Sequence, residues 1–292
     1  MFEMDEQSVK NRINKRKRIN SVFHGLFFAS TTIGLIVLVA LLYRVLTQGT
    51  GFFDWQFITS FPDPDPEDSG IFAGLIGSLW LMAIVAPVSI ILGVSTALFL
   101  EEYSSQGRLT RFIQANIQNL AGVPSIVFGL LGLTFFVYML NMGYTLIAGG
   151  LTMSLLVLPV IVVAAQEALR SVPKKLKEAS YGMGATKWQT IVRIVLPAAI
   201  PGIITGSILA LSRAIGETAP LIIVGAATAI YSLPDSLLSK YTVMPIQIYN
   251  WVGRPQADWQ FAASAGIIVL LIFLLVMNST AVFIRNKFSK RL

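Results

Sequence analysis

The chain has 292 residues, of which 54% are hydrophobic and only 13% are charged; its formal net charge is +7, and it has no cysteine. A soluble domain of this size covers its surface with more polar groups, so the composition excludes an ordinary soluble protein and indicates a membrane protein. The lack of cysteine excludes disulfides and thiolate metal sites.

Six apolar stretches are each long enough to cross a bilayer as a helix, which takes roughly 20 residues. We therefore predict an all-α, polytopic membrane protein with six transmembrane helices. A basic run precedes the first stretch, but that stretch is longer than a signal-peptide core and no small-residue cleavage site follows it, so we expect a retained helix. The predicted spans are approximately residues 22–46, 71–100, 112–140, 144–165, 198–230 and 261–284.

The basic residues orient these spans, because cytoplasmic loops collect Lys and Arg. All of the 22 Lys and Arg residues except Arg44, Lys240, Arg254 and Arg213 fall on one side of the predicted layout. Both termini are therefore predicted to be cytoplasmic, which agrees with an even number of crossings. The positive net charge then reflects anchoring near anionic lipid, and nucleic-acid binding is not expected.

The layout divides the chain into three parts. We predict a basic cytoplasmic tail (residues 1–21), a first transmembrane helix with an acidic, proline-rich external loop (22–70), and a transmembrane core (71–292). The core contains one long cytoplasmic loop (166–197).

Two full charges lie inside the fifth predicted span, in the segment LSRAIGETAPL. A charge at the bilayer centre costs at least about 2.5–3.5 kcal/mol, so both should face a partner or a water-filled cavity. They continue a face of small residues at helical spacing: Gly202, Gly206, Ala210, Arg213 and Glu217.

Two interpretations of this charged segment stay open. Arg213 and Glu217 are four residues apart and can pair on one helix, as a structural ion pair that locks the bundle. Alternatively, Arg213 meets an anionic substrate and Glu217 orients it. Thr218 is a further candidate for this pathway, as a hydroxyl donor.

The third predicted span carries a similar face of polar and small residues. Pro124 lies inside it and allows a kink if neighbouring protein satisfies the freed carbonyl. The face consists of Gln114, Gln118, Gly122, Ser125 and Gly129.

The second motif is cytoplasmic and reads EASYGMGATKWQTIVRIVLP, residues 178–197. Gly182 and Gly184 are typical of the end of a short helix. Thr186 followed by Gln189 predicts a capping box for a second helix that leads into the membrane. A short helix here suits docking into a groove on another protein, although composition alone equally allows a hairpin on the lipid surface.

This motif resembles the EAA motif of permease subunits of bacterial ABC importers, which reads EAA, three residues, G, nine residues, I-x-L-P. Only Ser180 departs from it, with another small residue in place of the second alanine. The resemblance implies that the loop carries the coupling helix that docks into an ATPase subunit, a role that falls to Glu178, Ala179 and Gly184. The matching residues are Glu178, Ala179, Gly184, Ile194, Leu196 and Pro197.

A narrower resemblance is to the A-type permeases of phosphate-specific ABC importers (PstA type). It rests on the six-span layout and on the segments NLAGVPSIVFGLLGL, RAIGETAPLIIVG and ADWQFAASAG. The partner permeases of such systems usually read ETMA where this chain has ETAP, which favours the A type. The resemblance implies the type I ABC importer permease fold and a part in phosphate passage for Arg213 and Glu217.

The same resemblance implies partners and a location. These are a second permease of PstC type, two ATPase subunits of PstB type and an external phosphate-binding protein of PstS type, in the plasma membrane of a bacterium. The sequence has no G-x-x-x-x-G-K-[ST] motif, so ATP is expected to bind the partner ATPase and this chain to be no enzyme. We expect no cofactor, metal ligands or catalytic residues; the lone His24 suits an interfacial side chain.

Other functions remain open from the residues alone. A membrane arginine does not identify which tetrahedral anion passes, so sulfate or molybdate import is an alternative. A membrane sensor that reports phosphate supply without flux is another. A stand-alone secondary carrier is the third, although it has no need of a docking motif.

Overall fold

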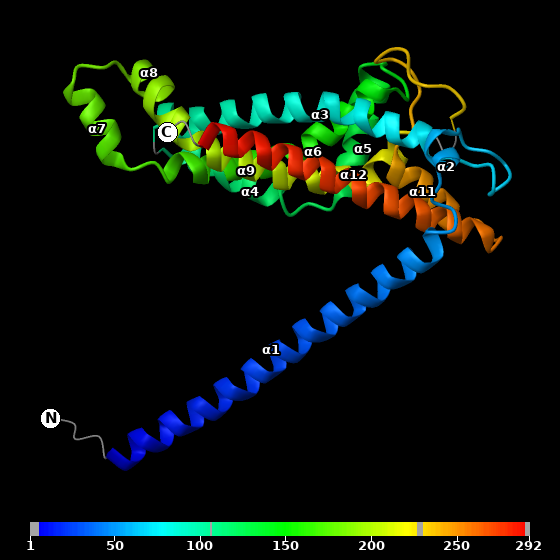
Figure 1. The fold of residues 1–292 in the computed structure, drawn as a ribbon. Helices are drawn as coiled ribbons and strands as arrows, with labels where there is room; N and C mark the ends of the chain where they lie inside the picture. The colour runs from blue at the N-terminus through cyan, green and yellow to red at the C-terminus, as the bar shows by residue number, and fades with distance from the viewer. Residues whose placement is uncertain (1–5, 106, 227–229, 290–292) are drawn as a thin grey trace.

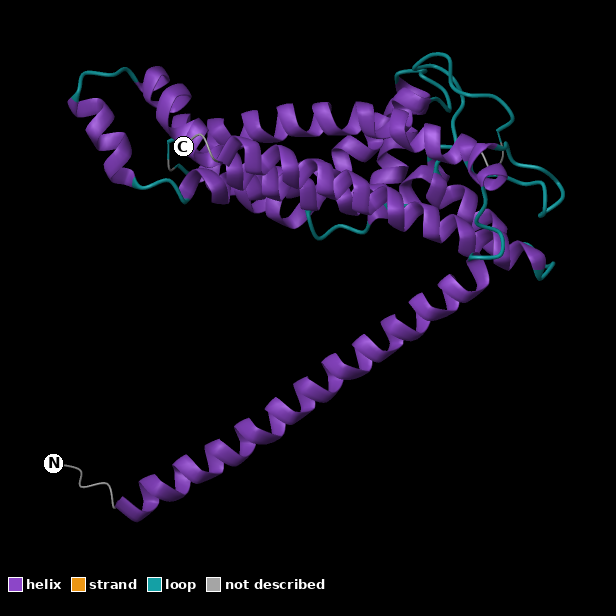
Figure 2. Ribbon diagram, viewed as in Figure 1, coloured by secondary structure: helices purple, strands orange, loops and turns teal. Residues whose placement is uncertain are grey.

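The structure, a computed structural model, describes residues 6–105, 107–226 and 230–289. Within these residues every regular element is a helix, which confirms the predicted all-α fold (Figure 2). Four long helices run side by side in a bundle (Figure 1). In chain order they are α3 (Phe72–Leu98), α6 (Leu146–Arg170), α9 (Leu196–Ile215) and α12 (Asp258–Ser289).

The shorter elements connect and extend this bundle. Three of them are π-helical: η1 continues α3, η2 continues α5, and η3 joins α8 to α9. The shorter elements are α2 (Trp55–Thr59), η1 (Phe99–Tyr103), α4 (Arg108–Leu120), α5 (Ser125–Gly132), η2 (Leu133–Met139), α7 (Lys174–Gly182), α8 (Lys187–Thr190), η3 (Ile191–Val195), α10 (Ala219–Ile223) and α11 (Met244–Val252).

Helix α6 lies at the centre of the bundle. It packs against α3, α9, α5 and α4, and it is the most buried of the long apolar helices. Helix α12 packs on α9 along one part of its length and on α11 along another. The bundle core is therefore organised around one apolar helix that touches most of the others.

Helix α1 (Glu6–Gly49) stands away from the bundle. It joins the bundle at its C-terminal end, where a Cβ atom on Gly49 would lie 2.8 Å from the backbone of Ala265 in α12. The apolar side chains over the rest of α1 are exposed. The first predicted span lies inside this helix, and its apolar surface has no cover within this chain's described residues.

Within the part of the chain that the structure describes, five helices are long and apolar enough to cross a membrane, and the number becomes six if α4 and α5–η2 count as one broken span. These two parts meet at 105°, so the third predicted span is broken at its centre. Pro124 explains the break, because it supplies no N–H and disfavours helical backbone at the residue before it. The predicted kink is a sharp corner.

The fifth predicted span is also misplaced. The continuous apolar helix runs over Lys187–Ile215 and therefore starts earlier and ends earlier than the predicted residues 198–230. Gly216 caps α9 by donating its N–H to the Arg213 carbonyl at 3.2 Å. In a continued helix the N–H of residue 220 would bond the Gly216 carbonyl, but Pro220 has none and instead opens the new helix α10.

The small-residue face of α9 is a close helix contact, as predicted. Gly202 faces Ala168 and Gly206 faces Ala164 across the boundary with α6. A Cβ atom on Gly206 would lie 2.4 Å from the Ala164 Cβ atom, far inside van der Waals contact. The two backbones can approach this closely only because the residues lack larger side chains.

We predict that Gly206→Ala lowers the thermal stability of the detergent-purified protein. Overpacking of this contact should cost about 1–3 kcal/mol of unfolding free energy. The matched control is Gly34→Ala in α1, where an added Cβ atom meets nothing within 4 Å. Equal melting temperatures for the two variants would contradict the close α6–α9 contact.

Candidate functional site

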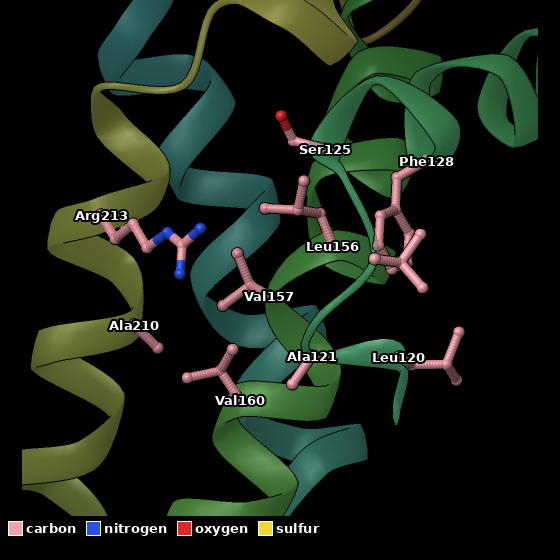
Figure 3. A pocket seen from close by; sticks show the side chains of 10 residues that line it. Leu120, Ala121, Ser125, Phe128, Leu156, Val157, Val160, Ala210 and Arg213 are labelled. Carbon is pink, nitrogen blue, oxygen red and sulfur yellow. The ribbon is translucent and has the colours of Figure 1, made fainter. Parts of the chain in front are cut away.

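Arg213 lies in the last turn of α9, and its side chain points towards α6 and the corner between α4 and α5 (Figure 3). A cavity of about 30 Å³ lies beside it, which is room for one or two water molecules. The residues around this cavity are Leu120, Ala121, Val123, Ser125, Phe128, Leu156, Val157, Val160, Ala210 and Arg213.

The cavity is level with the middle of the bundle. Its α6 wall is formed by Leu156, Val157 and Val160, which are central residues of the 25-residue helix Leu146–Arg170. Because α6 is long and apolar enough to cross a membrane, Arg213 lies near the middle depth of the apolar layer. Helix α9 thus ends about halfway across the apolar layer.

Arg213 and Glu217 are brought together as predicted. The Arg213 Nε donates to the Glu217 Oε1 at 3.4 Å. The pairing does not occur on one helix, however, because Glu217 lies beyond the end of α9 and its N–H donates to the Ala214 carbonyl. The helix-spacing part of the prediction is therefore wrong, and the turn after Gly216 holds the carboxylate near the guanidinium.

The two charged side chains differ strongly in exposure. The Arg213 side chain is 69% exposed and the Glu217 side chain 18%. A guanidinium has five donors, and the remaining N–H groups of Arg213 find no acceptor among the described residues. Arg213 therefore presents unused donors to the face of the bundle at middle depth.

Two broken spans meet at this point. A Cβ atom on Gly129 in α5 would lie 2.8 Å from the Pro220 Cα atom in α10, so these short helices are in direct contact. Non-helical backbone at membrane depth is tolerated only where protein or water satisfies it. The two breaks therefore lie next to each other, close to the charged pair.

Thr218 does not line the cavity with Arg213. It is the N-cap residue of α10, where its carbonyl accepts from the Leu221 and Ile222 N–H groups and its side chain makes no capping bond. Ser125, at the start of α5, lies on the opposite side of the cavity from Arg213 (Figure 3). The sequence placed Ser125 on a polar face next to Pro124 but gave no reason to assign it to the site.

The predicted cytoplasmic helix is α7, which protrudes with α8 from one end of the bundle (Figure 1). Glu178 and Ala179 are exposed on it. Ser180 faces the other way, and its buried hydroxyl hydrogen-bonds that of Thr190 at 2.9 Å. The residue that departs from the EAA pattern therefore holds α7 against the end of α8.

Glycine and a capping box shape the turn between α7 and α8. Gly184 has φ +82°, a left-handed conformation that favours glycine, and the following Ala185 N–H donates to the Ser180 carbonyl at 3.1 Å. Thr186 and Gln189 form the predicted capping box, with reciprocal bonds of 3.3 and 2.9 Å. The local prediction of a helix, a glycine turn and a second helix is confirmed.

The outer surface of α7, α8 and the turn between them mixes charged residues with large apolar or aromatic side chains. Four large side chains on it are exposed: Leu176, Tyr181, Met183 and Trp188. Among the described residues, no group of three or more His, Asp or Glu side chains is arranged to hold a metal ion. The chain therefore offers a charged pair at middle depth and a protruding pair of short helices with exposed large side chains at one end.

Residues 89–291 match the family described as the inner membrane component of binding-protein-dependent transport systems. The chain belongs to this family. It is a multi-pass protein of the bacterial plasma membrane, as predicted.

Individual relatives support the narrower resemblance. The chain is 33% identical over 289 residues to the probable ABC transporter permease protein YqgI of Bacillus subtilis (strain 168), covering 95% of this chain and 98% of that protein. It is 36% identical over 282 residues to the phosphate transport system permease protein PstA 1 of Mycobacterium tuberculosis (strain CDC 1551 / Oshkosh), covering 94% and 92%. The resemblance to PstA-type permeases is thereby confirmed.

The fold is shared with solved ABC importers. The chain superimposes on a chain of a bacterial alginate ABC transporter with a TM-score of 0.66, covering 92% of this chain and 96% of that one at 16% identity. The predicted ABC importer permease fold is therefore confirmed.

We predict that Gly184→Ala loosens the end of α7. A side chain in the left-handed region costs about 1–2 kcal/mol, so amide hydrogen exchange across residues 174–190 should be faster than in the unchanged protein. Gly182→Ala is the matched control, because Gly182 has open space around it and no positive φ. Equal exchange in both variants would contradict the role of Gly184.

Proposed function

We propose that this chain is the PstA-type permease subunit of an ATP-driven importer of inorganic phosphate, and that it encloses the path together with a PstC-type permease. The observation that carries the proposal is the 69% exposure of the Arg213 side chain level with the middle of α6. In an isolated subunit this guanidinium would face lipid, which is costly. A second permease over this face would convert it into the wall of an enclosed, polar path.

The pair geometry suits a transient anion site. Glu217 engages the Nε side of the guanidinium, which leaves the two terminal nitrogens for a tetrahedral oxyanion. The negative charge of Glu217 also weakens anion binding, and a path needs sites that release as well as bind. Ser125 and Thr218 are candidate hydroxyl donors to the passing anion.

The choice of phosphate rests on the PstA-type resemblance, which includes the mycobacterial phosphate transport system permease protein PstA 1. The cavity of about 30 Å³ is small, so passage requires the subunits to rearrange around it. Moving one negative charge inward against an inside-negative potential costs about 2.3 kcal/mol per 100 mV, which calls for an energy source.

That energy source is ATP hydrolysis by two PstB-type ATPases on the cytoplasmic side. In this proposal Glu178 and Ala179 on α7 contact the ATPase, and Gly184 ends the helix at the correct length. A PstS-type binding protein delivers phosphate to the outer end. The family description names dependence on a binding protein, which supports this part of the proposal.

We predict that Arg213→Gln abolishes ATP-dependent phosphate uptake into proteoliposomes that hold the whole complex, because the terminal donors for the oxyanion are lost. Sulfate should not compete in the unchanged complex. The matched control is Arg44→Gln in α1, which removes an exposed arginine away from the cavity and should retain uptake.

Three outcomes separate the possibilities. Uptake that survives in Arg213→Gln would contradict a substrate role and favour a structural ion pair. Failure of the variant complex to assemble would do the same. Wild-type uptake of sulfate in preference to phosphate would contradict the substrate assignment.

We predict that Glu178→Lys leaves the chain in the membrane but removes the ATPase from the purified complex, because the substitution reverses a charge on the exposed face of α7. The measurement is the ratio of ATPase to permease after affinity purification, together with uptake. A normal ratio with normal uptake would contradict the docking role of α7.

A further inference from the structure

Two adjacent carboxylates at the cytoplasmic end of α3 have no part in the path. Glu101 and Glu102 lie in the π-helical segment η1, and their side chains are only 14% and 8% exposed. Nearly buried carboxylates are costly unless they are paired, so each must satisfy a specific partner.

Glu101 binds the end of α6. Arg170 approaches it with two nitrogens, with Nη2–Oε1 at 2.6 Å and Nε–Oε2 at 3.0 Å. The Gln166 amide also donates to its Oε1 at 3.0 Å. Such two-point arginine–carboxylate contacts fix orientation as well as distance.

Glu102 binds the protruding helix. Its Oε1 accepts from the Lys177 Nζ at 2.5 Å, and the lysine side chain is itself only 24% exposed. Lys177 immediately precedes Glu178, the residue assigned above to the ATPase contact. The carboxylate of η1 is therefore joined directly to the coupling helix.

Tyr103 adds a third contact from the same short segment. The Lys187 ammonium, at the start of α8, lies 4.9 Å from the centre of its ring, within the range of cation–π attraction. Three consecutive residues of η1 thus contact α6, α7 and α8. Successive residues on a helix point in different directions, which allows one turn to reach three neighbours.

We propose that Glu101, Glu102 and Tyr103 form a clasp that makes the end of α3 move as one body with the coupling helix, with Glu102–Lys177 as the transmitting contact. This inference rests on the proposed docking of α7 to an ATPase. Apart from the clasp, α7 packs on α8 and η3. The clasp therefore gives ATPase movement a direct connection to α3.

Helix α3 can carry the movement of the ATPase across the apolar layer of the membrane. It packs along α6, and near its other end the Ser78 hydroxyl accepts from the Met244 N–H of α11 at 3.0 Å. A rigid connection at η1 would thus link the ATPase side with the elements at the outer end. Glu102 and Lys177 act as positioning residues, since neither lines the cavity beside Arg213.

The test compares phosphate uptake and ATP hydrolysis in the same proteoliposomes holding the complete complex. Glu102→Gln should keep assembly and basal hydrolysis but lower the phosphate transported per ATP by about 5-fold or more, the lower end of typical coupling between sites. Glu102→Lys combined with Lys177→Glu should restore the ratio. The matched control is Glu167→Gln, whose carboxylate is 68% exposed and pairs with Arg170 at 3.4 Å, so little change is expected.

A second readout is independent of the substrate. Spin labels on Phe99→Cys in η1 and Lys174→Cys at the start of α7 use the cysteine-free background. In the complex their distance distribution should be narrow and unchanged by trapping with ATP, and it should broaden when Glu102→Gln is added.

The proposal is overturned if Glu102→Gln keeps the wild-type ratio of phosphate transported to ATP hydrolysed. It is equally overturned if the distance between the labels changes on trapping with ATP while Glu102 and Lys177 are both unchanged. It is also overturned if Glu102→Gln reduces only the amount of assembled complex. A wild-type complex that takes up no phosphate contradicts the proposed function instead, and the label distances still decide whether the clasp is rigid.

Discussion

One arginine at the middle depth of an apolar bundle is the constraint on which the rest of the arrangement depends. A guanidinium there needs a polar surrounding, and this chain supplies only part of it: one carboxylate, Glu217, and a small cavity. Two spans are broken beside it, at Pro124 and at Gly216, so non-helical backbone lies next to the charge. The remaining face of Arg213 is open in this chain, and the proposed second permease would cover it.

At the cytoplasmic end, too, a few specific contacts hold an exposed element in place. Helix α7 is held by two specific bonds, Ser180 to Thr190 and Lys177 to Glu102, while Leu176, Glu178 and Tyr181 stay exposed on it. A helix held this way can receive a partner without rearranging its own supports. The long helices α3 and α9 connect this cytoplasmic end with the level of Arg213, and both pack on the central helix α6.

Local signals in the sequence predicted local structure well. Contacts between residues far apart in the sequence were harder to predict. The capping box at Thr186 and the turn at Gly184 were readable because both depend on neighbours in the chain. The early end of α9 was not, since the apolar residues continue past Gly216 and hydropathy does not report where backbone breaks inside protein. Ser125 and the Glu102–Lys177 pair were missed for a related reason: their partners lie on other helices, far away in the sequence.

The central claim is that the cavity beside Arg213 lies on a path that water and anions reach. The most direct test places a single cysteine at Ser125 in this cysteine-free chain and measures its reaction with a charged, membrane-impermeant thiol reagent in the working complex. We predict that the cysteine reacts while ATP is hydrolysed, whereas a control cysteine at the exposed, apolar Leu92 of α3 does not. A cysteine at position 125 that stays as unreactive as the control in every state would contradict the claim.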